Sequence, residues 1–111
     1  MAYSKDLAVR VSSHLDQMDP PELISKKMFG GVGYMVQGNM ACGVLEDKLI
    51  VRVGKPDYEE MLSREDTLPF DTTGRPMTGW VMVASCYTQS DDVLSEWVHR
   101  GVDFALTLPN K

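Results

Sequence analysis

The chain has 111 residues, 43% of them hydrophobic and 24% charged, and a net charge of -5. This length is typical of one domain, so we expect residues 1–111 to form a single domain. No apolar run approaches the ~20 residues of a membrane span, and the start lacks the apolar core of a signal peptide. We therefore expect a cytoplasmic protein, and the acidic balance disfavours direct nucleic-acid binding.

The first predicted element is a helix that begins after Ser4. Apolar residues recur at helical spacing at Leu7, Val11 and Leu15, and Ser4 is a residue type that caps helices well. Asp19 precedes a proline, and a residue in that position is disfavoured in helical conformation. The helix should therefore end there.

Short apolar runs separated by turn residues fill residues 23–53. The runs are Leu23-Ile24, Met28-Phe29, Gly33 to Gln37, Met40 to Leu45 and Lys48 to Val53. The turns between them are expected at Gly30-Gly31, Gly38-Asn39 and Glu46-Asp47. This pattern predicts an antiparallel meander of three or four strands.

In the last strand of this meander, successive side chains alternate between the two faces of the sheet. Leu49, Val51 and Val53 share one face, and Ile50 and Arg52 share the other. The second face is mixed in character, which indicates either a shallow groove or a subunit contact.

The rest of the chain predicts helix, strand and helix. Pro56 starts a short helix, residues 66–75 form a loop, and residues 79–84 form a strand. Ser90 caps a final amphipathic helix that stops at Pro109. The fold class is therefore α+β, an antiparallel sheet with flanking helices in two layers, in the order α-β-β-β-(β)-α-β-α.

The usual catalytic and cofactor motifs are not recognisable. The glycines at 30, 31 and 33 open a strand and not a helix, which favours a turn or bulge over a phosphate loop. His14 and His99 have no metal-ligand partner at motif spacing, and Cys42 and Cys86 lie in apolar runs typical of buried thiols. We expect no catalytic residue, no metal and no cofactor.

Four cations stand out because they lie on otherwise apolar or glycine-rich segments. They are Lys26, Lys27, Arg52 and Arg75. Brought together, they would form a site for a phosphate or for a carboxylate of a protein partner. The alternative is that they are solvated strand ends and that Arg75 forms a salt bridge with Asp71.

The aromatic and sulfur-containing residues also allow two interpretations. Trp80 and Trp97 are expected to pack the last strand against the last helix. The chain has eight methionines, concentrated in the strand region, which suits either adaptable core packing or a binding surface.

Four short blocks of sequence follow one another along the chain. They are residues 26–34 (KKMFGGVGY), 38–44 (GNMACGV), 49–54 (LIVRVG), and Phe70 followed by 74–77 (GRPM) and 79–81 (GWV). In these blocks the chain resembles the N-terminal domain of the TfoX/Sxy family of bacterial competence regulators. The resemblance implies a secretion-chaperone-like two-layer domain, often dimeric. We expect a stand-alone domain without the second, helical domain of the competence regulators.

The resemblance and the charge together lead to a functional hypothesis. We expect a non-enzymatic, protein-binding regulatory domain, for example a transcriptional co-regulator that acts through a DNA-binding protein. The alternative is a small anion-binding domain, or an enzyme of unknown reaction, that uses Lys26, Arg52 and Arg75. A homodimer formed through the mixed sheet face is a third possibility.

Overall fold

The computed structural model describes residues 4–28, 30–65, 67–70 and 78–109, apart from the side chains of Met28, Ser85 and Cys86. Within these residues there are six strands and four helices. The strands are β1 (Leu23–Met28), β2 (Gly31–Val36), β3 (Asn39–Leu45), β4 (Lys48–Arg52), β5 (Thr67–Pro69) and β6 (Trp80–Val83). The helices are α1 (Lys5–Met18), α2 (Lys55–Leu62), α3 (Ser85–Thr88) and α4 (Asp91–Leu106).

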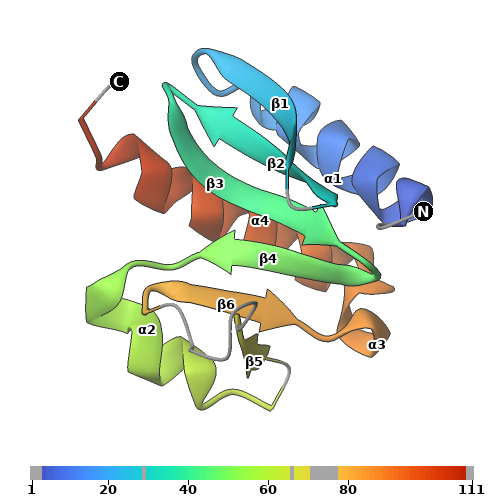
Figure 1. Cartoon of the computed structure of the whole chain (residues 1–111), viewed down its shortest axis with the longest axis vertical. Helices are drawn as coiled ribbons and strands as arrows, with labels where there is room; N and C mark the ends of the chain where they lie inside the picture. Colours follow the sequence, from blue (N-terminus) through green and yellow to red (C-terminus); the bar gives the residue numbers. More distant parts are fainter. Residues whose placement is uncertain (1–3, 29, 66, 71–77, 110–111) are drawn as a thin grey trace.

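The strands form one antiparallel sheet in the order β1-β2-β3-β4-β6-β5 (Figure 1). The first four strands are consecutive hairpins, as the turn spacing predicts. β6 then pairs with β4, and the short β5 takes the edge beyond it. The predicted α+β class and layered arrangement are therefore confirmed.

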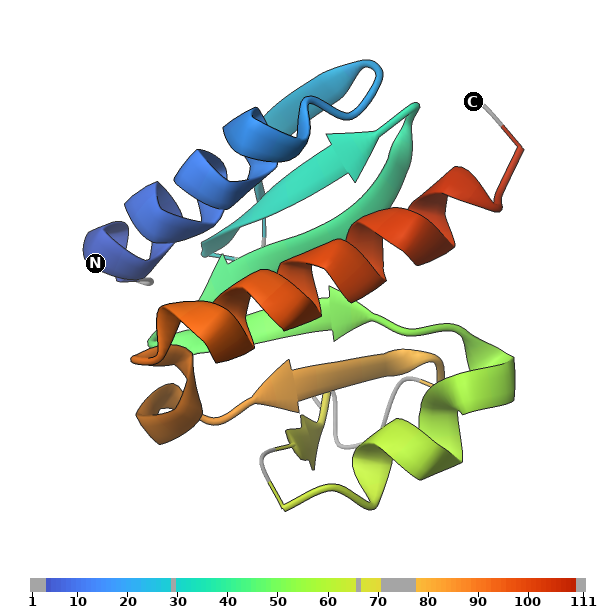
Figure 2. The ribbon, with the colours of Figure 1, turned by 180° about the vertical axis from the view of Figure 1, so that it is seen from behind.

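Helices α1 and α4 lie side by side on one face of the sheet (Figure 2). Their buried residues are Leu7, Val11 and Leu15 on α1, and Leu94, Trp97, Val98, Gly101, Val102 and Ala105 on α4. These side chains pack on the inward-facing residues of the strands to form the core. We call this side of the sheet the covered face.

Both long helices begin where the sequence predicts. The hydroxyl of Ser4 accepts a hydrogen bond from the backbone N–H of Leu7, and Ser90 accepts one from Val93 in the same way. Such caps satisfy backbone donors that the first helical turn leaves unpaired. α1 ends with Asp19 in left-handed conformation, and α4 ends before Pro109.

Two turns and two elements differ from the prediction. Gly31, which was expected in the first turn, is the first residue of β2 and pairs with Met28. The β2–β3 turn lies at Gln37 and Gly38, both with positive φ, one residue earlier than expected. Asn39 therefore belongs to β3, where its buried side chain donates a hydrogen bond to the carbonyl of Pro109 at 2.9 Å. β5 lies inside the predicted 66–75 loop, and α3 is a single turn that was not anticipated.

A bulge in the β2–β3 ladder matters for the face opposite the helices. Tyr34 pairs with Cys42 but Met35 pairs with Met40, so that Ala41 is the extra residue. Ala41 is fully buried, and its carbonyl oxygen occupies the place that a Cβ on Gly101 of α4 would take. The bulge thus lets α4 approach β3 closely while Met40 stays on the opposite face.

Candidate functional site

The face of the sheet turned away from α1 and α4 is the candidate site, and we call it the open face. The strand register assigns its residues, because directly paired residues project on the same side. From β1 to β5 they are Ile24, Lys26, Met35, Met40, Leu45, Lys48, Ile50, Arg52, Met82, Trp80 and Leu68. No described helix lies over β1 to β4 on this face (Figure 1).

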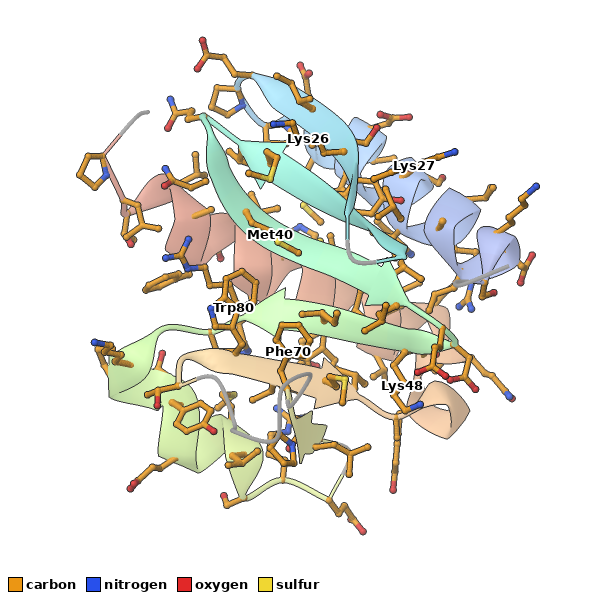
Figure 3. All side chains as sticks on the ribbon, in the orientation of Figure 1. Lys26, Lys27, Met40, Lys48, Phe70 and Trp80 are labelled. Carbon is orange, nitrogen blue, oxygen red and sulfur yellow. The ribbon has the colours of Figure 1, made fainter. Side chains whose placement is uncertain are left out.

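The open face carries two exposed large apolar side chains and several partly buried ones. Ile24 is 57% exposed and Leu68 is 41% exposed, and they lie on the two edge strands. Between them, Met40 lies across the surface of β3 (Figure 3), with its methyl group where a Cβ on Gly43 would be. The predicted mixed face of β4 is confirmed, and it extends across the whole sheet.

Ile50 and Phe70 are two further buried apolar residues. Neither belongs to the main core. The centroid of the Phe70 ring lies 6.2 Å from that of the Trp80 ring (Figure 3). The two rings are tilted relative to each other, and aromatic pairs favour such tilted arrangements over face-to-face stacking.

The prediction for Trp80 was wrong, and that for Trp97 was right. Trp97 is 1% exposed in the core beneath α4. Trp80 pairs with Arg52 and is only partly buried, on the open face. The core positions of β6 are Val81 and Val83 instead.

The structure does not bring the four predicted cations together. Lys26 lies on the open face, whereas Lys27 pairs with Val32 and lies on the other side, beside α1 (Figure 3). Arg52 shares the open face with Lys26 but lies three strands away, roughly 14 Å by strand spacing alone. Arg75 and Asp71 lie outside the described residues.

Arg52 has an environment that the sequence did not reveal. Its guanidinium carbon lies 5.2 Å from the centroid of the Trp80 ring and 5.6 Å from that of Phe104 on α4. Both distances are within the range of cation–π attraction. Among the described residues, Arg52 has no carboxylate or hydrogen-bond partner.

A cavity of about 310 Å³ opens beside Arg52, where β4 ends and α2 begins. Arg52, Lys55, Trp80, Phe104 and the backbone at Gly54 and Gly79 are among its lining residues. Sequence reasoning missed Lys55 and Phe104, because only the tertiary fold places α4 against the end of β4. The glycine at position 54 was a usable sequence signal of this cavity. Its backbone has a positive φ, which favours glycine, and the ring of Phe104 lies where a Cβ would be.

A second hollow, of about 480 Å³, adjoins this cavity and shares Phe104 with it. Its lining includes the acidic residues Asp57, Glu96 and Asp103 together with Arg100 and His99. The Nε of Arg100 is buried without a described hydrogen-bond partner, and its guanidinium lies 5.6 Å from the centre of the Trp97 ring. The hollow therefore carries residues of both charges, unlike the described lining of the cavity beside Arg52.

The cysteines and histidines are the remaining residue types that could carry chemistry. Cys42 is fully buried in the core, as predicted, and burial raises the pKa of its thiol to about 12. His99 is exposed and contacts Ser95 one turn earlier on α4, while His14 lies 4.0 Å from Asp91. The side chain of Cys86 lies outside the described residues.

Metal and membrane features were searched over the same part of the chain. No group of three or more His, Cys, Asp or Glu side chains among the described residues could hold a metal ion. In that part of the chain, no helix is both long enough and apolar enough to cross a bilayer.

The fold and the site define a small α+β domain with one sheet face packed under helices and the other face carrying apolar and cationic side chains. This chain belongs to the TfoX N-terminal domain family, whose model matches residues 13–105. That is a family of regulatory, competence-associated domains and not a known enzyme family. The comparisons with curated proteins and with solved structures gave no match.

Proposed function

We propose that this protein is a non-enzymatic regulatory domain that binds a protein partner through the open face. The observation that carries the proposal is the exposed apolar surface on that face, with Ile24 more than half exposed at its edge. Apolar groups gathered on one face often mark interaction sites, whereas scattered ones need no explanation. The methionines at 35 and 40 add adaptable contact area.

The charge of the molecule favours a protein partner over bare nucleic acid. The net charge is -5, and the cations on the open face stand well apart. Lys26 and Arg52 are therefore suited to separate carboxylates on a partner surface, which is the role we propose for them. A transcriptional co-regulator that acts in the cytoplasm through a DNA-binding protein fits this chemistry.

Two further proposals concern assembly. Residues 1–111 act as one domain, since all the described strands belong to a single sheet. A second copy of the chain is the rival occupant of the open face, and occupancy by a copy would make the protein a homodimer. Light scattering at high protein concentration tests this directly, because a monomeric mass rejects the dimer.

The test of the proposal is affinity capture with a matched pair of variants. Ile24→Asp places a charge on the open face, and Val9→Asp places one at a residue of α1 that is 67% exposed on the opposite layer. We expect wild-type protein and Val9→Asp to capture the same specific partner, and Ile24→Asp to lose it. Equal capture by both variants would contradict the assignment to the open face.

A gel-shift assay tests the regulatory mechanism separately. We expect the purified chain not to retard DNA on its own, because its acidic charge opposes association with phosphates. Tight, sequence-specific retardation by the chain alone would overturn an indirect mode of action.

A further inference from the structure

The cavity beside Arg52 has the features of a ligand site. It lies where β4, α2, β6 and α4 meet, which is a place fixed by tertiary packing and not by one flexible segment. Two of its lining residues, Arg52 and Lys55, are cations, and two, Trp80 and Phe104, are aromatic. No acidic residue lines it among the residues that the structure describes.

Two aromatic rings contact Arg52, and no residue in the described part of the chain accepts a hydrogen bond from it. The rings of Trp80 and Phe104 lie within 6 Å of its guanidinium carbon, and these contacts restrict the side chain without using its N–H groups. No described carboxylate lies within ion-pair distance of Arg52 or Lys55. A guanidinium ordered in this way presents its donors to whatever occupies the cavity.

The other end of the same strand supplies a contrast. Lys48 is on the same face of β4, and its ammonium lies 3.3 Å from a carboxylate oxygen of Asp47. The acidic protein thus has many carboxylates that could pair with its cations. Acidic residues outnumber basic ones by 16 to 11, yet Arg52 and Lys55 have no carboxylate partner among the described residues.

The walls and the size of the cavity restrict the class of ligand. A volume of about 310 Å³ is at the lower end of the range for small-molecule sites. The aromatic walls suit a flat or apolar body, and the two cations suit an oxyanion. We propose that this cavity binds a small organic oxyanion, a carboxylate or phosphate on a compact apolar group, with Arg52 as its principal anchor.

The proposal shares Arg52 with the partner-binding role of the open face, but it does not depend on the exposed apolar residues of that face. Of the cations that the sequence singled out, it retains Arg52, and it replaces the others with Lys55 and the two aromatic rings. Loss of partner capture by Ile24→Asp would leave it untouched.

The test uses nuclear magnetic resonance, with the two tryptophans as reporters. Trp80 lines the cavity and Trp97 lies in the core, so their indole N–H signals separate binding from general perturbation. The probes are phenyl phosphate, benzoate and inorganic phosphate, with benzyl alcohol as the uncharged control. We expect a saturable shift of the Trp80 signal with phenyl phosphate or benzoate, and little change at Trp97.

Three variants make the test specific. Arg52→Gln should weaken binding of the aromatic oxyanion by about tenfold or more, since a charge-assisted hydrogen bond is lost. Lys55→Gln, at an exposed residue, should weaken it less, and Lys48→Gln should bind like wild type. Lys55→Gln provides a readout even where Arg52→Gln fails to fold.

Two results with the wild-type protein would overturn the assignment: an equal Trp80 shift with benzyl alcohol, or no saturable shift with any of the oxyanions. Unchanged affinity in folded Arg52→Gln would also overturn it. If Arg52→Gln does not fold, unchanged affinity in Lys55→Gln would do the same. A preference for phenyl phosphate or for benzoate would support the site and identify the anionic group that it takes.

Discussion

The two faces of the sheet are built from the same strands but are stabilised in different ways. On the covered face, valines and leucines from every long strand pack against α1 and α4, and most are fully buried. On the open face, methionines, lysines and single aromatic residues replace them, and most of these are only partly buried. The comparison teaches that the covered face determines the stability of the fold, which leaves the open face available for recognition.

The largest expected effect separates the two tryptophans. Trp97→Ala removes a core side chain that is 1% exposed and should lower the free energy of unfolding by about 3–5 kcal/mol. Trp80→Ala, on the open face, should cost only about 1–2 kcal/mol, because it removes a partly buried ring and one aromatic pair. Urea denaturation of both variants measures the difference. Equal losses would contradict the division between the faces.

The second prediction concerns Cys42, which lies beneath the covered face. Burial raises the pKa of its thiol to about 12, so the reactive thiolate is scarce at pH 8. Compared with an exposed cysteine, native Cys42 should react with iodoacetamide about a thousandfold more slowly. Peptide mapping by mass spectrometry measures the labelling of this residue alone. Urea-unfolded protein, which should label rapidly, is the control.

The third prediction concerns the edges of the open face. β1 is an edge strand with Lys26 and Lys27 in its middle, and charged residues on an edge discourage pairing between molecules. β5, at the opposite edge, is short and contains Pro69, which cannot donate to a ladder. Lys26→Val with Lys27→Val should therefore raise self-association, measured by analytical ultracentrifugation. Lys5→Val with Lys55→Val, which removes the same charge from the starts of two helices, should not.

The smallest expected effect is electrostatic and lies between the helices. An Arg10 side chain on α1 hydrogen-bonds Asp91 at the start of α4 at 2.7 Å, and this contact lowers the pKa of the Asp91 carboxyl. Because the pKa of Asp91 is lower in the folded state than in the unfolded state, the contact stabilises the protein at pH values above the ordinary aspartate pKa of about 4. That stabilisation is lost as the pH falls through the pKa of the folded state. The melting temperatures of wild type and Asp91→Asn should therefore differ slightly at pH 7 and converge in acid. A difference that grows in acid would contradict this sign.

The sequence predicted most of the fold because its signals are local. Ser4 and Ser90 cap their helices through contacts within one turn, and the alternation of Leu49, Val51 and Val53 is visible within one strand. The ordered motifs also identified the family. β5 was missed because three residues that include a proline resemble a loop.

The candidate site was less predictable because it depends on pairing between distant segments. The run from Trp80 to Val83 is apolar throughout, so its own pattern does not show which residues face the helices. Only the register that pairs Arg52 with Trp80 places that ring on the open face. The approach of Phe104 to Arg52 likewise joins residues about fifty positions apart, which no local pattern encodes.

The most direct test of the central claim is site-specific photo-crosslinking in cells of the source organism. A photoreactive amino acid is placed at residue 24 on the open face, or at residue 9 on the exposed side of α1. The account predicts a discrete adduct with one protein partner from residue 24 and none from residue 9. Adducts of the same partner from residue 9 alone, or from neither residue, would contradict it.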